Sequence, residues 1–294
     1  MKLLSVIIVG YKNYKVLKDC LDSIRKYNDI GEKLEVIVVD NSPDSSYIYN
    51  HIREEFSEVI TIRGKKNGFG AGNNAGVRMA KGEYLLFLNA DTILIEPIFE
   101  YAVGKFKEDS LLSLFGLKLL NKDLSDSLSY YFIDRIGLIY ILLIRFFNKM
   151  NIFISNKMFI SGADIFIRKD VFVKAGMFDE NIFMYKEECD LLKRISMLDK
   201  RLKIKYFKDK RIIHIGRASS NTKIIAIEES LKSRLYYYKK YGMNSSKFMK
   251  KQIRLYNKKM FYYKFINKKK YQENKVYKDI YLKAIRLVGE CYEK

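Results

Sequence analysis

The chain has 294 residues, of which 48% are hydrophobic and only 2 are proline, so we expect most of it to fold, as one large domain or one domain with an appendage. Its three cysteines (Cys20, Cys189 and Cys291) are far apart and form no CxxC pair, which argues against a disulfide framework or a structural zinc site and favours a reducing cytosol. The net charge is +21, and residues 222–294 alone hold 20 basic against 6 acidic side chains.

Two apolar segments could be mistaken for targeting or membrane signals. The run 3–10 lacks a small-residue cleavage site and leads directly into the polar segment YKNYK, so we expect a buried strand rather than a signal peptide. In segment 132–147 the longest uncharged run is 136–144, far short of the roughly 20 residues that a spanning helix needs. We therefore expect no membrane span.

Strand and helix patterns alternate through the first 89 residues. Apolar runs predict strands at 3–9, 34–40, 59–63 and 83–89, and helical spacing predicts helices at 16–27, near 46–56 and near 71–80. This alternation indicates an α/β fold with a mostly parallel, doubly wound sheet. Ligands of such sheets bind beyond the carboxyl ends of the strands, which here are followed by Gly10–Tyr11, Asp40–Asn41, Arg63–Asn67 and Asn89–Asp91.

The second half of the chain is less regular. Residues 118–157 give no clear pattern, after which we expect an alternating strand at 158–169, a helix near 187–199 and two short strands at 202–207 and 211–216. From about 222 the pattern is helical, basic and rich in tyrosine. We therefore divide the chain into a domain at 1–221, with halves at 1–117 and 118–221, and a basic helical extension at 222–294.

The segment NGFGAGNNAG (67–76) is rich in glycine but fits neither common phosphate-binding motif. A dinucleotide-binding GxGxxG would need glycine where Asn73 stands, and a P-loop would need Lys-Ser/Thr after the last glycine. The segment instead predicts a tight turn into a helix N-terminus, whose free N–H groups can bind phosphate or hydroxyl oxygens. A purely structural turn is the alternative.

Three polar residues, two just after predicted strands and one inside a predicted strand, each have two interpretations. Asp40 could bind a ribose or base edge, or simply begin an Asx-turn. Asp91 could hold Mg²⁺, which commonly uses one or two protein carboxylates, or cap a helix beginning near 95–96. His214, in the apolar segment RIIHIG, is more often a core residue than a ligand.

Glu187, Glu188 and Asp190 form an acidic cluster where a helix is expected to begin. Acids in a first helical turn often serve only the helix dipole. The spacing of Tyr185, Glu188 and the apolar pair 191–192 places Glu188 on a buried face, where a carboxylate can have a raised pKa and act as a general base. Both interpretations stay open on the residues alone.

Six segments occur together in the order of one known family: SVIIVGYKN (5–13), EVIVVDNSPD (35–44), NGFGAGNNAG (67–76), GEYLLFLNADT (82–92), FISGADIFIRKDVFVKAGMFDENIFMYKEECDLLKRI (159–195) and IIHIGRASS (212–220). The chain resembles the family-2 glycosyltransferases, which have the GT-A fold with a Rossmann-like nucleotide-binding half. Within them it is similar to the rhamnosyltransferase-like branch of bacterial cell-surface polysaccharide assembly. The segments extend over about three quarters of the chain.

The resemblance implies a donor site with a divalent cation, Mg²⁺ or Mn²⁺. Asp40 resembles the acid that contacts the donor nucleoside. Asp91 stands at the last acid of the family's DxD metal motif, with Asn89 in place of the first, and His214 resembles a late histidine near the diphosphate. The predicted donor-binding residues are Tyr11, Asp40, Asn41, Asn67, Gly68, Gly70, Asn73, Asn74 and Asn89, and the predicted metal site comprises Asp91 and His214.

The resemblance also implies an inverting, metal-dependent enzyme. Glu188 stands at the position of the catalytic base, where the family usually has Asp, and Glu187 and Asp190 stay open as alternatives. We expect a UDP- or dTDP-linked sugar as donor, a glycan or lipid-linked acceptor, and a cytoplasmic protein. The charge of the basic extension and the apolar segment 132–147 favour association with the inner face of the plasma membrane. The rival hypotheses are a nucleic-acid-binding α/β protein that uses the basic extension, which we do not favour, and a non-catalytic relative that binds nucleotide sugars.

Overall fold

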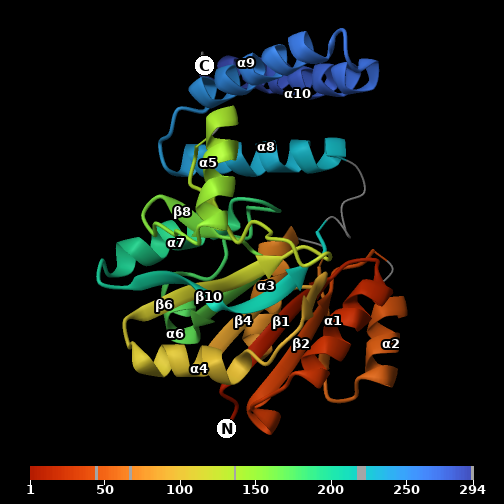
Figure 1. Ribbon diagram of the computed structural model, residues 1–294, viewed down its shortest axis with the longest axis vertical. Coiled ribbons are helices and arrows are strands. Elements are labelled where there is room, and N and C mark those ends of the chain that lie inside the picture. The colour runs from red at the N-terminus through yellow and green to blue at the C-terminus, as the bar shows by residue number, and fades with distance from the viewer. Residues whose placement is uncertain (44–45, 66–67, 136, 217–222, 293–294) are drawn as a thin grey trace. The chain divides into compact units, whose positions relative to one another are not determined.

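The computed structural model describes residues 1–43, 46–65, 68–135, 137–216 and 223–292 (Figure 1). The chain divides into two compact units, one formed by 1–133 and 142–219 and the other by 134–141 and 220–294. The division between domain and extension that we predict at 221/222 falls outside the described residues, so it stays a prediction.

The first unit is built on an eight-stranded sheet in the order β3-β2-β1-β4-β9-β6-β10-β5. The four strands from β3 to β4 are mutually parallel, as are β6 and β10, whereas β9 and β5 run antiparallel to their neighbours. The strands are β1 (Leu4–Gly10), β2 (Leu34–Asp40), β3 (Ile60–Arg63), β4 (Tyr84–Asn89), β5 (Thr92–Leu94), β6 (Leu112–Leu120), β9 (Asp164–Arg168) and β10 (Lys203–His214). This architecture confirms the predicted mostly parallel, doubly wound sheet.

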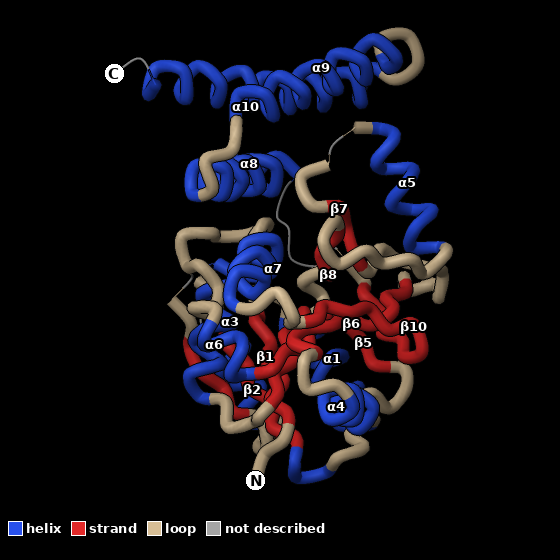
Figure 2. The backbone as a smooth tube through the Cα atoms, turned by 90° about the vertical axis from the view of Figure 1, so that its left-hand side faces the viewer, coloured by secondary structure: helices blue, strands red, loops and turns tan. Residues whose placement is uncertain are grey.

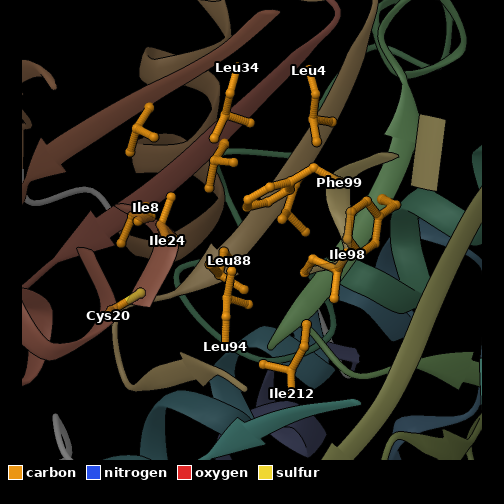
Figure 3. Close-up of a cluster of buried hydrophobic side chains, with 14 of the residues drawn as sticks. Leu4, Ile8, Cys20, Ile24, Leu34, Leu88, Leu94, Ile98, Phe99 and Ile212 are labelled. Atoms are coloured by element: carbon orange, nitrogen blue, oxygen red, sulfur yellow. The ribbon is translucent and has the colours of Figure 1, made fainter. Parts of the chain in front are cut away.

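Helices cover both faces of the sheet, and each layer has its own apolar core. On one face the strands pack against α1 (Tyr14–Lys26), α2 (Ser46–Glu55) and α4 (Phe99–Glu108), and Figure 3 shows Leu4, Ile8 and Leu88 of the strands together with Ile24 and Phe99 of the helices. On the other face lie α3 (Gly68–Met79), α6 (Lys169–Lys174) and α7 (Glu187–Leu198). The helices thus bury β1, β2 and β4, which explains their uninterrupted apolar runs, whereas the edge strand β3 is only partly buried.

The stretch 118–157, which begins with the end of β6, contains two elements that its sequence pattern did not reveal. It contains the strand β7 (Tyr130–Phe132), which pairs with β8 (Met158–Ile160), and the helix α5 (Leu138–Lys149). Asn148 holds β7 in place, because its side chain accepts from the N–H of Ser129 at 2.8 Å and donates to the carbonyl oxygen of Tyr130 at 3.1 Å.

Two predicted boundaries are wrong for reasons of pairing. The predicted strand 158–169 is two strands, because β8 pairs with β7 whereas β9 pairs with β4 and β6. The two strands predicted at 202–207 and 211–216 are the single strand β10, and the polar residues 208–210 form a bulge, seen as a register shift against β6.

The second unit is helical. Its elements are α8 (Lys223–Lys240), α9 (Ser245–Tyr263) and α10 (Lys268–Tyr292), which are blue in Figure 2. Residues 134–141 also belong to this unit, and Asp134 forms an ion pair with Arg234 of α8 at 3.6 Å. Within the described residues, no helix combines the length and the apolar character needed to cross a bilayer.

Candidate active site

Three residues predicted for donor and metal binding come together at the carboxyl end of β4. Asn89 is the last residue of β4, and Asp91 precedes β5. Because β5 pairs antiparallel with β10, His214 lies opposite Thr92. The His214 Nε2 atom is therefore 3.3 Å from Asp91 Oδ1 and 3.4 Å from Asn89 Nδ2.

The surroundings of Asp91 and His214 argue against their structural interpretations. The helix expected near 95–96 begins only at Phe99, with Ile98 as its N-cap, so Asp91 does not cap it. The side chain of His214 is 22% exposed and that of Asp91 is 13% exposed, so neither is a core residue. A carboxylate and an imidazole that share one partly open corner can both meet a ligand.

This corner fits a hard cation only together with ligand oxygens. Among the described residues, no three His, Cys, Asp or Glu side chains are grouped closely enough to hold a metal ion. Asp91 supplies one carboxylate, and Mg²⁺ commonly completes its shell with water and substrate phosphates. The chemistry of the residues therefore suits a cation that binds together with a diphosphate.

Asp40 ends β2 with one carboxylate oxygen bound and the other unpartnered. Its side chain is fully buried, and Oδ1 accepts from the N–H of Ser42 at 2.9 Å, as expected for an Asx-turn. Its Oδ2 atom has no hydrogen-bond partner among the described residues. A buried polar atom without a partner is costly, so the Asx-turn accounts for only half of this carboxylate.

Asn41 and Tyr11 lie beside Asp40 at the same edge of the sheet. The Nδ2 atom of Asn41 donates to the carbonyl oxygen of Gly68 at 3.1 Å, so this amide joins the end of β2 to the start of α3. Tyr11 follows β1 and is partly exposed, with the Nζ atom of Lys12 5.2 Å from its ring centroid. Tyr11 presents a partly exposed ring, and the Oδ1 atom of Asn41, like Oδ2 of Asp40, is buried without a hydrogen-bond partner among the described residues.

The glycine-rich segment is a helix, not the tight turn that we expected. Helix α3 begins at Gly68, so Gly70, Gly72 and Gly76 lie inside it. A Cβ atom on Gly76 would lie 2.5 Å from Ile7 Cγ2, which shows that the glycines allow α3 to pack closely onto the sheet. Asn67, another predicted donor-binding residue, lies outside the described residues.

The start of α3 is occupied by protein rather than open to a phosphate. The N–H of Phe69 donates to the carbonyl oxygen of Phe183 at 2.9 Å. Gly68 has φ +92°, and a Cβ atom there would lie 2.1 Å from that same oxygen. Position 68 therefore requires glycine, because the 178–186 loop contacts its backbone.

Asn73 and Asn74 are buried and bonded within the protein. Asn73 donates from Nδ2 to the carbonyl oxygen of Phe69 at 3.0 Å. Asn74 accepts from the N–H of Phe178 at 3.0 Å and donates to Glu180 Oε1 at 3.0 Å. Asn74 therefore holds the 178–186 loop against α3, whereas the bond of Asn73 stays within the helix, and the donor contacts of both amides stay a prediction.

The same loop delivers the acidic cluster to the site. Tyr185 and Lys186 both have left-handed backbones, with φ 66° and 89°, and α7 begins immediately after them at Glu187. The carboxylate of Glu188 lies against Gly162, since a Cβ atom on Gly162 would be 2.6 Å from Glu188 Oε1. The neighbouring Ala163 accepts from the N–H of Asn89 at 3.0 Å, so the acidic cluster and the Asp91 corner adjoin the same break between β8 and β9.

The three acids differ in their environments. Burial, reinforced by the charge of Glu188, raises the pKa of Glu187 well above its ordinary value. Burial also raises the pKa of Glu188, although the charge of Lys186 and backbone N–H groups oppose the shift. Asp190 is fully buried and forms an ion pair with Arg194, with Oδ2 2.7 Å from Nη2. Glu188 is thus the acid that is partly exposed and unpaired with an arginine.

Two functional candidates were missed at the sequence level. Gly162 leaves room for the Glu188 carboxylate, and its place in FISGAD gave no sign of a partner 26 residues later. Lys186 is only 6% exposed, and its charge lowers the pKa of Glu188. In the sequence, a lysine beside two glutamates looks like an ordinary pair of surface charges. Neither contact could be found without the left-handed turn that precedes α7.

The sequence of the chain is similar to those of known sugar transferases. The family model described as glycosyl transferase family 2 matches residues 5–175. The chain is 28% identical over 217 residues to rhamnosyltransferase WbbL of Escherichia coli (strain K12), covering 67% of this chain and 78% of the relative. It is 36% identical over 92 residues to a poly(ribitol-phosphate) beta-glucosyltransferase of Bacillus spizizenii, covering 30% of this chain and 14% of that relative.

A solved structure shares the fold. Mannosyltransferase PcManGT from Pyrobaculum calidifontis, determined in complex with GDP-Man and Mn²⁺, superposes with a TM-score of 0.57 at 15% identity. The match covers 80% of this chain and 64% of that chain. At this identity the likeness shows the fold alone, which is the GT-A arrangement expected from the sequence.

Proposed function

Because the chain belongs to glycosyl transferase family 2, we propose that it is a metal-dependent, inverting enzyme that moves a sugar from a nucleotide-diphosphate sugar to an acceptor hydroxyl. The observation that carries the proposal is that Glu188 and the Asn89–Asp91–His214 corner adjoin one strand break. The names of the two bacterial relatives favour an acceptor in cell-surface polysaccharide assembly, either a glycan or a lipid-linked sugar at the cytoplasmic face of the membrane.

For the donor, we assign the nucleoside to the edge formed by β1 and β2. The unpartnered Oδ2 of Asp40 can accept from a ring N–H, which uracil and thymine both carry, so a UDP- or dTDP-linked sugar suits this residue. Tyr11 offers a partly exposed ring beside it. Asn89, Asp91 and His214 then face the diphosphate.

A divalent cation, Mg²⁺ or Mn²⁺, would be held by Asp91 and the diphosphate and would offset the charge that develops on the departing nucleotide. His214 is close enough to Asp91 to orient its carboxylate or to bind a phosphate oxygen. The mannosyltransferase that shares the fold was determined with GDP-Man and Mn²⁺, which supports a divalent cation as the partner of the donor.

Glu188 acts as the general base in this proposal. It removes the proton from the acceptor hydroxyl while that oxygen attacks the anomeric carbon from the face opposite the leaving group, which inverts the anomeric centre. Because the pKa of Glu188 is raised, the base is better matched to an alcohol than an exposed glutamate would be. Burial and the charge of Glu188 raise the pKa of the neighbouring Glu187, so the two carboxyl groups do not readily ionise together.

The test compares Glu188→Gln with Glu187→Gln in assays of sugar transfer and of donor binding. We expect Glu188→Gln to lower kcat by about 10²- to 10⁴-fold with donor affinity retained, as is typical for loss of a general base. Glu187→Gln keeps the size and hydrogen-bonding capacity of the side chain and leaves the assigned base in place, so it should keep most of the activity. Near-normal turnover of Glu188→Gln would contradict the assignment, and donor binding without turnover in the unaltered protein would indicate a non-catalytic relative.

A further inference from the structure

The connection between α9 and α10 combines dense positive charge with exposed apolar side chains. Segment 258–270, which we call the hairpin tip, contains six lysines and no acidic residue. Within it Phe261, Tyr262, Phe265 and Ile266 are 77%, 61%, 81% and 65% exposed. Four large apolar side chains are thus exposed within six residues, and exposed apolar side chains gathered in this way usually mark an interaction site.

The hairpin tip is presented by a folded scaffold. Helices α9 and α10 lie side by side (Figures 1 and 2), and the Tyr256 ring of α9 contacts Tyr277 and Tyr281 of α10 at centroid distances of 5.9 and 5.7 Å. At the turn, Asn267 Oδ1 caps α10 by accepting from the N–H of Lys270 at 2.9 Å. The apolar side chains are therefore held outward by an ordered hairpin.

Charge and apolar surface coincide within the tip. The Nζ atom of Lys264 lies 5.3 Å from the centroid of the Phe265 ring, and that of Lys270 lies 5.1 Å from the centroid of the Tyr263 ring. Lysine stems can extend along apolar surface while their ammonium groups stay in water. An interface with acyl chains below and phosphates above offers partners to both parts at once.

We propose that the hairpin tip inserts into the surface of a bilayer rich in anionic phospholipids. Phe265 and Ile266 enter the boundary between headgroups and acyl chains, Tyr262 lies at the headgroup level, and the lysines bind lipid phosphates. Six lysines without an acid repel a second copy of the tip. A nucleic acid would satisfy the charge and could stack on the rings but would leave the aliphatic Ile266 exposed, so the tip favours a lipid surface.

Sedimentation of the full-length protein with vesicles tests the apolar part of the proposal. We expect binding to phosphatidylcholine vesicles that contain about 30% phosphatidylglycerol, and a partition coefficient at least about tenfold lower for Phe265→Ser/Ile266→Ser. The matched control is Val173→Ser/Met197→Ser, which removes two apolar side chains that are 50% and 73% exposed in the first unit and should bind as the unaltered protein does. Equal binding of the Phe265→Ser/Ile266→Ser protein would overturn the proposal.

The charge is tested by Lys268→Gln/Lys269→Gln/Lys270→Gln, which should bind anionic vesicles more weakly than Lys247→Gln/Lys250→Gln/Lys251→Gln, a triple change near the opposite end of α9. Equal loss in both triples, or a salt-sensitive complex with an oligonucleotide that outcompetes the vesicles, would also overturn it. All substituted side chains are exposed or partly exposed, so unchanged circular dichroism is expected. Vesicle binding needs no donor sugar, so its outcome is independent of the glycosyl transfer proposed above.

Discussion

Asp164 is a second buried carboxyl group, distinct from the acidic cluster on α7. It lies at the start of β9 and is fully buried, and its Oδ2 accepts from the N–H of Leu117 at 2.6 Å. The backbone pairing of β9 with β6 extends only to Phe115 and Phe166, so the Asp164 side chain binds the N–H of Leu117 beyond the last backbone pair. Burial raises the pKa of Asp164 well above its ordinary value.

The raised pKa makes stability depend on pH in a defined direction. The folded protein keeps the Asp164 proton at pH values where the unfolded chain, with a pKa of about 3.9, has lost it, so the stabilisation is present below that value and is lost as pH rises through the folded pKa. We expect the free energy of unfolding to fall less between pH 5 and 8 in Asp164→Asn than in the unaltered protein, by at least about 1 kcal/mol. Urea titrations at each pH measure this.

A suitable control for that series is Asp19→Asn, at an exposed position of α1, which should follow the unaltered protein. Glu187 titrates in the same direction and leaves a residual slope in Asp164→Asn. Parallel curves for Asp164→Asn and the unaltered protein would show that Asp164 is ionised in the fold.

For single residues, the sequence indicated which side chains could take part in chemistry but not which residues they contact. Asp91 and His214 are 123 positions apart, and only the antiparallel pairing of β5 with β10 shows that they meet. Asn73 and Asn74 look like ligand-binding amides in a glycine-rich segment, yet their partners are the backbone one turn earlier and a loop about 100 residues later. Partners so distant in the chain leave no local signal.

Helix α3 determines how closely the nucleotide-binding half is packed. Glycines in a helix interior normally weaken it, by roughly 0.5–1 kcal/mol each relative to alanine. Here the lost propensity is offset by contact with the sheet, since a Cβ atom on Gly76 would lie 2.5 Å from Ile7 and one on Gly72 would lie 3.0 Å from Val9. The glycines that suggested a turn are therefore a packing device.

Substitution of Gly76 by alanine separates packing from propensity. We expect Gly76→Ala to lower the free energy of unfolding by about 1–3 kcal/mol, because the new methyl group would overlap Ile7. Gly104→Ala, inside α4 where nothing lies within 4 Å of the added atom, should raise it by about 0.5–1 kcal/mol. Chemical denaturation measures both, and a Gly76→Ala protein as stable as the unaltered one would refute the packing role.

Strands could be predicted from the sequence where burial leaves an uninterrupted run of apolar residues. The runs that became β1, β2 and β4 carry their own signal, because every residue from Ile37 to Val39 or from Leu85 to Leu88 is buried. Segment 118–157 lacks one, because several apolar side chains of α5, such as Leu142 and Phe146, are exposed rather than packed in the core. Its secondary structure follows from tertiary contacts such as those of Asn148.

The charges of the two units suit two different tasks, which are sugar transfer and membrane binding. The sheet unit holds the acids that the reaction needs, whereas the helical unit carries most of the excess lysine and the hairpin tip. An enzyme that acts on a lipid-linked acceptor gains from such an arrangement, because membrane binding raises the local concentration of acceptor without any change at the site.

The most direct test of the central claim is a thermal-shift panel of UDP, dTDP, GDP and CMP, each with and without Mn²⁺, on the unaltered protein and on Asp91→Ala. A ligand that binds only the folded state raises Tm by mass action. We predict that one nucleotide, UDP or dTDP, raises Tm of the unaltered protein only when Mn²⁺ is present, and that Asp91→Ala loses this increase. No shift with any nucleotide, with or without metal, would contradict the account and direct attention to nucleic acid as the ligand.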